Sequence, residues 1–151
     1  SNYVIGAYNR NVFDQMNQIL AQLDHGFAYT FSAEDGLDEI SLSNTSYFYK
    51  VQGTSCSEES SFSPEELGFN RVQPEELLGG SPEKNAEIFT QILAGEGTQA
   101  QTDIVVLNAA FAIHASGKVD SLKEAKMMAQ NAISEGYAKG LLVDFISATK
   151  T

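Results

Sequence analysis

The sequence has little cysteine, tryptophan, proline or positive charge. Among its 151 residues, one is a cysteine, none is a tryptophan and three are prolines. The single cysteine, Cys56, excludes an internal disulfide of the kind that staples small secreted domains. No apolar run reaches the roughly 18–20 residues that a transmembrane helix needs, and the first residues lack the basic stretch that opens a signal peptide. We therefore expect a cytoplasmic protein with no membrane contact.

Positive charge is outnumbered two to one by negative charge. Nine Lys and Arg residues stand against 20 Asp and Glu residues, a net charge of −11, and 15 of the acidic residues fall within residues 1–100. An acidic surface repels phosphate backbones and anionic lipids, so we expect no nucleic-acid partner. Because 42% of the residues are hydrophobic, the chain can bury a core. Its length suits one domain by the usual measure of roughly 100–200 residues.

The first third of the chain predicts a β-α-β unit. Residues 3–8 are β-branched and aromatic, as in a buried strand, and residues 27–31 form a second run of this kind. Between them, residues 12–23 place apolar side chains at steps of three and four, which indicates an amphipathic helix. Asn9 and Asn11 are both candidates for its N-cap. Such a unit joins two parallel strands by a right-handed crossover.

The middle of the chain predicts a pair of antiparallel strands followed by a loop. Residues 40–42 and 45–51 are the two apolar runs, and Asn44 between them suits a tight turn. Residues 52–63 are rich in serine and glutamate and predict a mobile surface loop.

The remainder predicts helices. Ser81 precedes a proline, as an N-cap residue often does, and Ser121 opens a capping box. Residues 104–115 are apolar on nearly all sides, as in a buried helix, and residues 141–146 belong to a last amphipathic helix. The fold class expected from the whole pattern is α/β, with a mixed, largely parallel sheet and flanking helices. We treat residues 1–151 as one unit.

The most suggestive polar segment is the acidic turn Asp35-Gly36-Leu37-Asp38-Glu39. It emerges from the carboxyl end of the strand at 27–31, which is where parallel α/β sheets bind ligands. Adjacent carboxylates supply hard oxygen ligands, and Mg²⁺ typically takes one or two of them together with substrate phosphates. The turn can therefore hold magnesium against a polyphosphate. The alternative is a solvated acidic turn without a ligand, because Asp and Gly recur in turns for backbone reasons alone.

Other polar residues have structural explanations. Residues 79–82 resemble a capped helix start rather than a phosphate cradle, because they lack the Gly-Lys-Ser/Thr of a P-loop. His114 lies in an apolar helix and is expected in the core, while His25 lies near a helix C-terminus, where its partial charge suits the dipole. Cys56 lacks the electropositive surroundings of a reactive thiol. Asn108, inside an apolar helix, must find hydrogen-bond partners and predicts a structural network.

The acidic run and its flanks resemble one enzyme family. Residues 35–42, Asp-Gly-Leu-Asp-Glu-Ile-Ser-Leu, look like the magnesium-binding signature of anthranilate phosphoribosyltransferases. Five further segments fit the family in order and spacing, so the resemblance covers essentially the whole chain. These segments are residues 4–8, 63–69, 79–88, 107–110 and 121–125.

The resemblance implies a fold, an activity and a metal site. The fold is the C-terminal half of the larger α/β domain of a phosphoribosyltransferase or nucleoside-phosphorylase type. The activity is transfer of phosphoribose from phosphoribosyl pyrophosphate to the amine of anthranilate, with release of pyrophosphate, a step of tryptophan biosynthesis. Asp38 and Glu39 would hold Mg²⁺, with Asp35 and Ser41 as neighbours at most.

Several family features have no counterpart in these residues. They are the N-terminal helical domain, a Gly-Thr-Gly-Gly-Asp loop for the diphosphate, a Lys-His-Gly-Asn segment and an arginine for the anthranilate carboxylate. Arg10 and Arg71 are the only arginines, and neither lies in the corresponding context. We therefore expect a C-terminal fragment that is inactive by itself, and no catalytic or substrate-binding residue is assigned.

Two other functions remain open, together with an expectation about assembly. One is a non-catalytic binding or regulatory module that keeps the same fold. The other is a different phosphoribosyltransferase or nucleoside phosphorylase of this architecture. We also expect an apolar face to be exposed and to support a homodimer.

Overall fold

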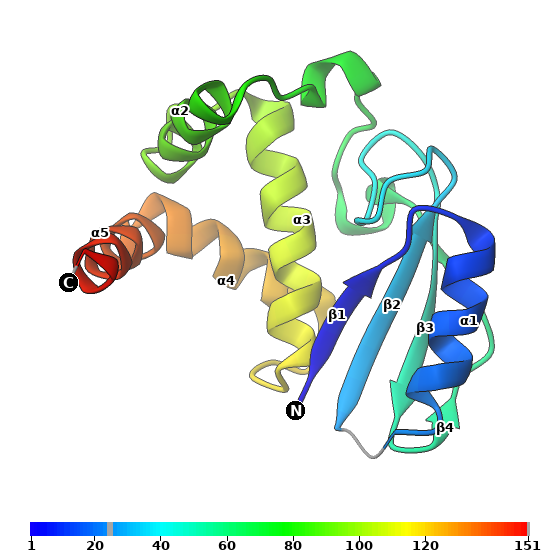
Figure 1. Ribbon diagram of the computed structural model, residues 1–151. Helices are drawn as coiled ribbons and strands as arrows, with labels where there is room; N and C mark the ends of the chain where they lie inside the picture. Colours follow the sequence, from blue (N-terminus) through cyan, green and yellow to red (C-terminus); the bar gives the residue numbers. More distant parts are fainter. Residues whose placement is uncertain (24–25, 151) are drawn as a thin grey trace.

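The computed structural model describes residues 1–23 and 26–150 and shows one sheet with helices on both faces (Figure 1). The strands are β1 (Tyr3–Gly6), β2 (Phe27–Ala33), β3 (Ser46–Gln52), β4 (Ser55–Cys56) and β5 (Ser60–Phe62). The helices are α1 (Arg10–Leu20), α2 (Pro82–Leu93), α3 (Gln99–Ala115), α4 (Leu122–Ser134) and α5 (Tyr137–Thr149). Two short 3-10 helices, η1 (Pro64–Leu67) and η2 (Pro74–Leu77), precede α2. In Figure 1, α1 covers one face of the sheet, α3 lies against the other, and α2 and α5 lie beyond α3.

The sheet is mixed, as expected, but it is not largely parallel. Its order is β1-β2-β3-β4, with β5 also paired to β3. In the described residues β1 and β2 are parallel, and the other three pairings are antiparallel. Parallel neighbours need a long crossover, and in the part of the chain that the structure describes α1 lies in the one crossover that joins paired strands in parallel. The α/β class and the first β-α-β unit are confirmed.

Two expectations for the middle of the chain are wrong. Residues 40–42 form no strand. Side chains bond the backbone of the first two: Ile40 pairs with Asn108, and the Ser41 N–H donates to Ser46 Oγ at 2.9 Å. The Leu42 carbonyl oxygen accepts from the Val72 N–H at 3.3 Å, and Val72 belongs to no strand. Residues 52–63 are not a free loop. They contain β4 and β5, which satisfy the backbone groups along the outer edge of β3.

The helices begin close to the expected caps. Asn9, not Asn11, is the N-cap of α1, and its Oδ1 accepts from the Val12 N–H at 2.9 Å. Ser81 and Ser121 cap α2 and α4 in the same way. In the described part of the chain, no helix is long and apolar enough to cross a membrane.

The core lies mainly between the sheet and α3. Alternate side chains of β2 point to opposite faces, so Tyr29 and Phe31 face α3 while Ala28 packs with Leu20 of α1. Phe111 of α3 is fully buried and makes edge-to-face contacts with the rings of both Tyr29 and Phe31. This packing fixes how α3 lies along β1 and β2.

Tyr29 carries the one strongly shifted pKa of the core in the described residues. Its side chain is 1% exposed, and its hydroxyl lies 3.1 Å from His114 Nδ1, which places His114 in a satisfied position as expected. Burial raises the pKa of Tyr29 to about 12. The folded-state pKa thus lies above the unfolded value of 10, so the stability from the neutral hydroxyl is complete below pH 10 and is lost as the pH rises toward 12.

We predict that the free energy of unfolding falls more steeply between pH 10 and 12 in the wild-type chain than in Tyr29→Phe. The extra slope is about 1.4 kcal/mol per pH unit, because the unfolded tyrosine ionises first. Urea denaturation of both proteins at half-unit pH steps measures it. Parallel pH profiles for the two proteins would contradict the prediction.

Candidate metal centre

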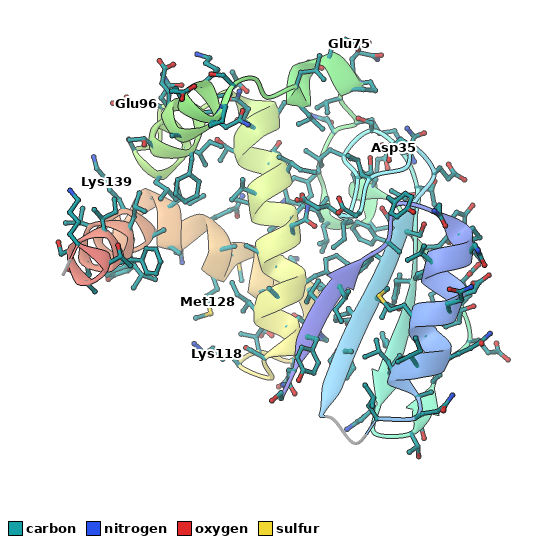
Figure 2. All side chains as sticks on the ribbon, in the orientation of Figure 1. Asp35, Glu75, Glu96, Lys118, Met128 and Lys139 are labelled. Carbon is teal, nitrogen blue, oxygen red and sulfur yellow. The ribbon has the colours of Figure 1, made fainter. Side chains whose placement is uncertain are left out.

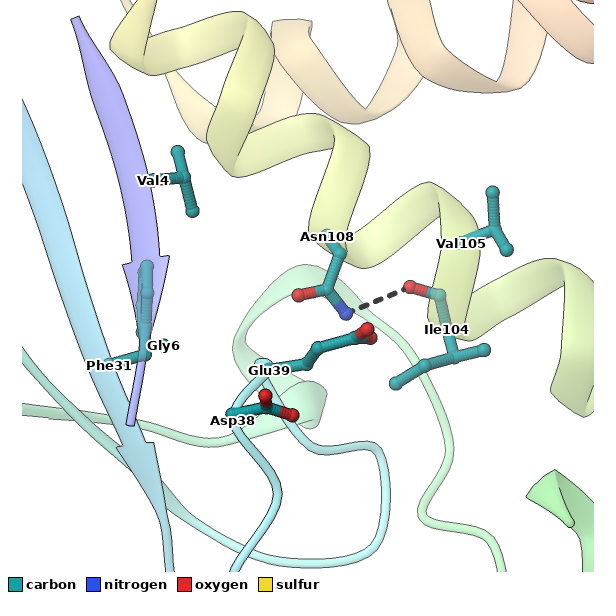
Figure 3. A pocket seen from close by; sticks show the side chains of 8 residues that line it. All are labelled: Val4, Gly6, Phe31, Asp38, Glu39, Ile104, Val105 and Asn108. Atoms are coloured by element: carbon teal, nitrogen blue, oxygen red, sulfur yellow. Dashed lines mark hydrogen bonds between the residues drawn. The ribbon is translucent and has the colours of Figure 1, made fainter. Parts of the chain in front are cut away.

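Asp38 and Glu39 lie side by side in the loop that joins β2 to β3, residues 34–45. Both side chains are exposed. Together with Gly6 at the end of β1 and Asn108 of α3, they line a cavity of about 370 Å³. The rest of its wall is apolar and consists of Val4, Phe31, Ile104 and Val105. The cavity therefore lies at the carboxyl ends of the two parallel strands, where this type of sheet binds ligands (Figure 3).

The backbone of Asp38 lies directly against β1. A Cβ built on Gly6 would come within 1.6 Å of the Asp38 carbonyl oxygen and 2.3 Å of its carbonyl carbon. Real Cβ atoms do not approach other atoms so closely, so only glycine leaves room for the Asp38 peptide at this place. Residue 6 thereby sets how near the acidic pair lies to the end of β1.

Asn108 holds the residue that follows Glu39. Its Oδ1 accepts from the Ile40 N–H at 3.0 Å, and its Nδ2 donates to the Ile40 carbonyl oxygen at 3.0 Å. The same Nδ2 lies 3.1 Å from the carbonyl oxygen of Ile104, one turn earlier in α3. This confirms Asn108 as a member of a structural network, and it shows that the network reaches Ile40, the residue next to the acidic pair.

The carboxylate of Asp35 accepts hydrogen bonds from within the loop, so it is less available to a ligand than the carboxylates of Asp38 and Glu39. Its Oδ2 accepts from Ser41 Oγ at 2.5 Å, and its Oδ1 accepts from the Leu37 N–H at 3.3 Å. Ser41 Oγ in turn accepts from the backbone N–H groups of Ser43 and Asn44 at 2.9 and 3.0 Å. Figure 2 shows Asp35 in this loop, at the end of β2. Asp35 and Ser41 are thus neighbours of the acidic pair, as the family resemblance implies.

The carboxylates of Asp38 and Glu39 have no protein partner among the residues described: no hydrogen bond or ion pair engages either one. Figure 3 shows both in the space between β1 and α3, with Glu39 extended toward α3. The described residues contain no group of three or more His, Cys, Asp or Glu side chains that could hold a metal. Two carboxylates without further protein ligands suit Mg²⁺, which keeps other positions for water and phosphate.

The remaining candidates have the expected structural roles. Ser81 Oγ accepts from the Lys84 N–H at 3.3 Å, so residues 79–82 are a capped helix start. Cys56 is exposed on β4, and desolvation raises the pKa of its thiol, which opposes formation of the reactive thiolate. The interpretation of His25 lies outside the described residues.

Sequence reasoning missed the role of Gly6. The available signal is a glycine inside an apolar strand pattern, which often marks the close approach of another backbone segment. The segment that approaches is 32 residues away in the sequence, so the glycine alone does not identify it.

Comparisons with known proteins identify similar sequences and a shared fold. The model of the glycosyl transferase family, a/b domain, matches residues 1–139. The chain is 36% identical over 150 residues to an anthranilate phosphoribosyltransferase of Ruminiclostridium cellulolyticum, which is 98% of this chain and 43% of that protein. The chain therefore spans less than half the length of such relatives.

Two solved structures share the fold. Anthranilate phosphoribosyltransferase from Thermus thermophilus superposes with a TM-score of 0.84 at 29% identity, over 100% of this chain and 44% of that one. The enzyme from Saccharomyces cerevisiae in complex with phosphoribosyl pyrophosphate and Mg has a TM-score of 0.87 at 20% identity, over 99% of this chain and 42% of that one. The resemblance inferred from residues 35–42 and their flanks is confirmed.

We predict that Ser41→Ala lowers the free energy of unfolding by about 1–3 kcal/mol, since it removes one hydrogen-bond donor to Asp35 and the acceptor of two loop amides. Urea denaturation measures the change. Ser134→Ala is the matched control, because that exposed hydroxyl makes one long hydrogen bond within its own helix, and we expect a change within about 0.5 kcal/mol. Equal losses in the two variants would contradict the proposed role of the Ser41 hydroxyl.

Proposed function

This chain belongs to the glycosyl transferase family, and from that premise we propose that it supplies the magnesium-binding part of an anthranilate phosphoribosyltransferase active site. The observation that carries the proposal is the pair of unengaged carboxylates, Asp38 and Glu39, on the cavity at the end of β1. The name of the relative at 36% identity supports the choice of reaction within the family.

The proposed reaction joins the amine nitrogen of anthranilate to C1 of phosphoribosyl pyrophosphate. The bond between C1 and the diphosphate oxygen breaks, pyrophosphate leaves with the bonding electron pair, and the amine loses a proton. A Mg²⁺ ion held by Asp38 and Glu39 would supply neutralisation of the charge on the leaving diphosphate and would help to orient it. The yeast relative that contains phosphoribosyl pyrophosphate and Mg supports this pairing of substrate and metal.

Asp38 and Glu39 would hold the ion through their carboxylate oxygens. They are the only two acidic side chains that line the described cavity, and no basic side chain lines it. A diphosphate alone would be repelled by them. Binding of the polyphosphate at this cavity therefore requires a cation between the protein and the ligand, which makes the proposed site metal-dependent.

We propose that the 151-residue chain has no transferase activity by itself. In the described part of the molecule, neither an arginine nor a lysine lines the cavity, so no group there is positioned to hold the carboxylate of anthranilate or a second phosphate. Positioning of both reactants supplies much of the rate of a two-substrate reaction. Product formation from Mg²⁺, phosphoribosyl pyrophosphate and anthranilate, followed by the loss of anthranilate fluorescence, would contradict this proposal.

We predict that the chain binds phosphoribosyl pyrophosphate only in the presence of Mg²⁺, and that Asp38→Asn/Glu39→Gln weakens this binding at least about tenfold, because the variant removes the metal ligands. Isothermal titration calorimetry with and without Mg²⁺ measures both effects.

The matched control is Glu75→Gln/Asp144→Asn, which changes the net charge equally at two exposed positions away from the cavity. We expect its affinity to equal that of the wild-type chain. Equal weakening in the two double variants would mean that overall charge controls the binding, and binding that ignores Mg²⁺ would favour a non-catalytic module.

We also propose that the chain self-associates through α5. This helix has no buried residue, and Tyr137, Leu141 and Phe145 are 72%, 71% and 63% exposed at steps of four, which places them on one stripe. An exposed apolar stripe of this kind marks an interaction surface, and a second copy can cover it symmetrically with the same residues.

We predict a dimer in light scattering at high protein concentration and a monomer for Leu141→Glu/Phe145→Glu, because two charges on the stripe oppose its burial. Ile19→Glu on α1 is the control: this residue is also exposed, at 58%, but lies on the opposite side of the sheet from α3. A monodisperse wild-type monomer, or equal dissociation by both changes, would contradict the proposed interface.

A further inference from the structure

We propose that Gly6 and Asn108 are positioning residues that hold the backbone of residues 38–40 from two sides, so that Asp38 and Glu39 present both carboxylates to one metal ion. We call this pair the Gly6–Asn108 clamp. The inference rests on the proposed function, because it assigns the clamp to the metal site of Asp38 and Glu39.

The first half of the clamp is the pair of hydrogen bonds that Asn108 makes with Ile40. Asn108 bonds the N–H and the C=O of the same residue, Ile40, much as a neighbouring strand would, so it restrains the peptide groups on both sides of that residue. The Ile40 side chain is fully buried in the core beside α3. The chain immediately after Glu39 is therefore fixed by its backbone and by its side chain together.

The second half of the clamp is the close steric contact between Gly6 and Asp38. Gly6 contacts the Asp38 carbonyl group so closely that no side chain fits between them. Gly6 itself is fixed, because it is paired with Phe31 in the parallel ladder of β1 and β2. The acidic pair thus lies between two rigid elements, the end of β1 and the middle of α3, although it belongs to a loop.

Metal binding explains why such restraint is useful. Mg²⁺ requires nearly octahedral geometry, and two adjacent carboxylates repel each other until the cation binds. A free loop would lose conformational entropy on binding and would separate the two charges beforehand. Asn108 is also neutral, so it orders the loop without placing a positive charge that competes with the metal for the carboxylates.

The test measures metal binding directly and does not depend on turnover. Mn²⁺ is added to the ¹⁵N-labelled chain, and the broadening of the backbone amide signals of residues 38–40 gives an apparent affinity. We expect Asn108→Ala and Gly6→Ala each to weaken Mn²⁺ binding about tenfold or more, the usual cost of removing a group that orients metal ligands. Hydrogen exchange of the Ile40 amide should accelerate in both variants.

Two matched controls separate positioning from general stability. Asn17→Ala removes a buried asparagine, whose amide bonds the Phe13 carbonyl and the Thr30 hydroxyl on the opposite face of the sheet. Gly140→Ala adds a methyl group in α5 where no atom lies within 4 Å. We expect the Mn²⁺ affinity of both to equal that of the wild-type chain, even where Asn17→Ala lowers the free energy of unfolding as much as Asn108→Ala does.

The outcomes distinguish this inference from the proposed function. If the wild-type chain binds Mn²⁺ at Glu39 but Asn108→Ala binds equally well, the clamp is not a positioning device and the metal site stands. If wild-type and Asp38→Asn/Glu39→Gln give the same spectra with Mn²⁺, both proposals fail. Should Gly6→Ala not fold, Asn108→Ala alone decides between these results. Equal weakening by Asn108→Ala and Asn17→Ala would also overturn the clamp.

Discussion

The pairing between the Asn108 side chain and the backbone of Ile40 is the contact on which the arrangement of the candidate site depends. It joins α3 to the loop after β2 across 68 residues of sequence, and it does so at the residue next to the acidic pair. Because Ile40 is fully buried, its polar backbone groups need partners, and the amide of Asn108 supplies both. The packing of Phe111 against the sheet, one turn further along α3, keeps that amide in place.

The acidic residues of the loop fall into two groups with different roles, although all of them carry the same kind of carboxylate group. Asp35 accepts hydrogen bonds from within the loop and stabilises its turn. Asp38 and Glu39 lie outside that network and carry uncompensated negative charge beside a cavity. Uncompensated carboxylates on a cavity wall are costly to bring near an anionic substrate, and a divalent cation removes that cost. This division is the physical basis for the proposal that residues 38 and 39 bind the metal.

The sequence predicted the helices and their caps better than it predicted the strands of the middle segment. The step of three and four in α1 and the caps at Ser81 and Ser121 depend on neighbours in the chain, so they were predictable. The pattern at residues 40–42 was misleading, because alternation of apolar and polar residues is the same for a strand and for a buried loop whose backbone is bonded by side chains. β4 and β5 were missed because the edge of β3 decides their pairing.

The sequence by itself determined the β-α-β unit, the family resemblance, the two adjacent carboxylates and a polar residue in α3 that had to find partners. Each of these is a local pattern or an order of motifs, so it can be recognised in the sequence alone. Only the tertiary structure decided that Asn108 meets Ile40, that Gly6 makes room for Asp38, and that most strand pairs are antiparallel. The first two of these contacts join residues that are 68 and 32 positions apart in the sequence. Contacts at such distances follow from how the whole core packs, and no window of the sequence contains them.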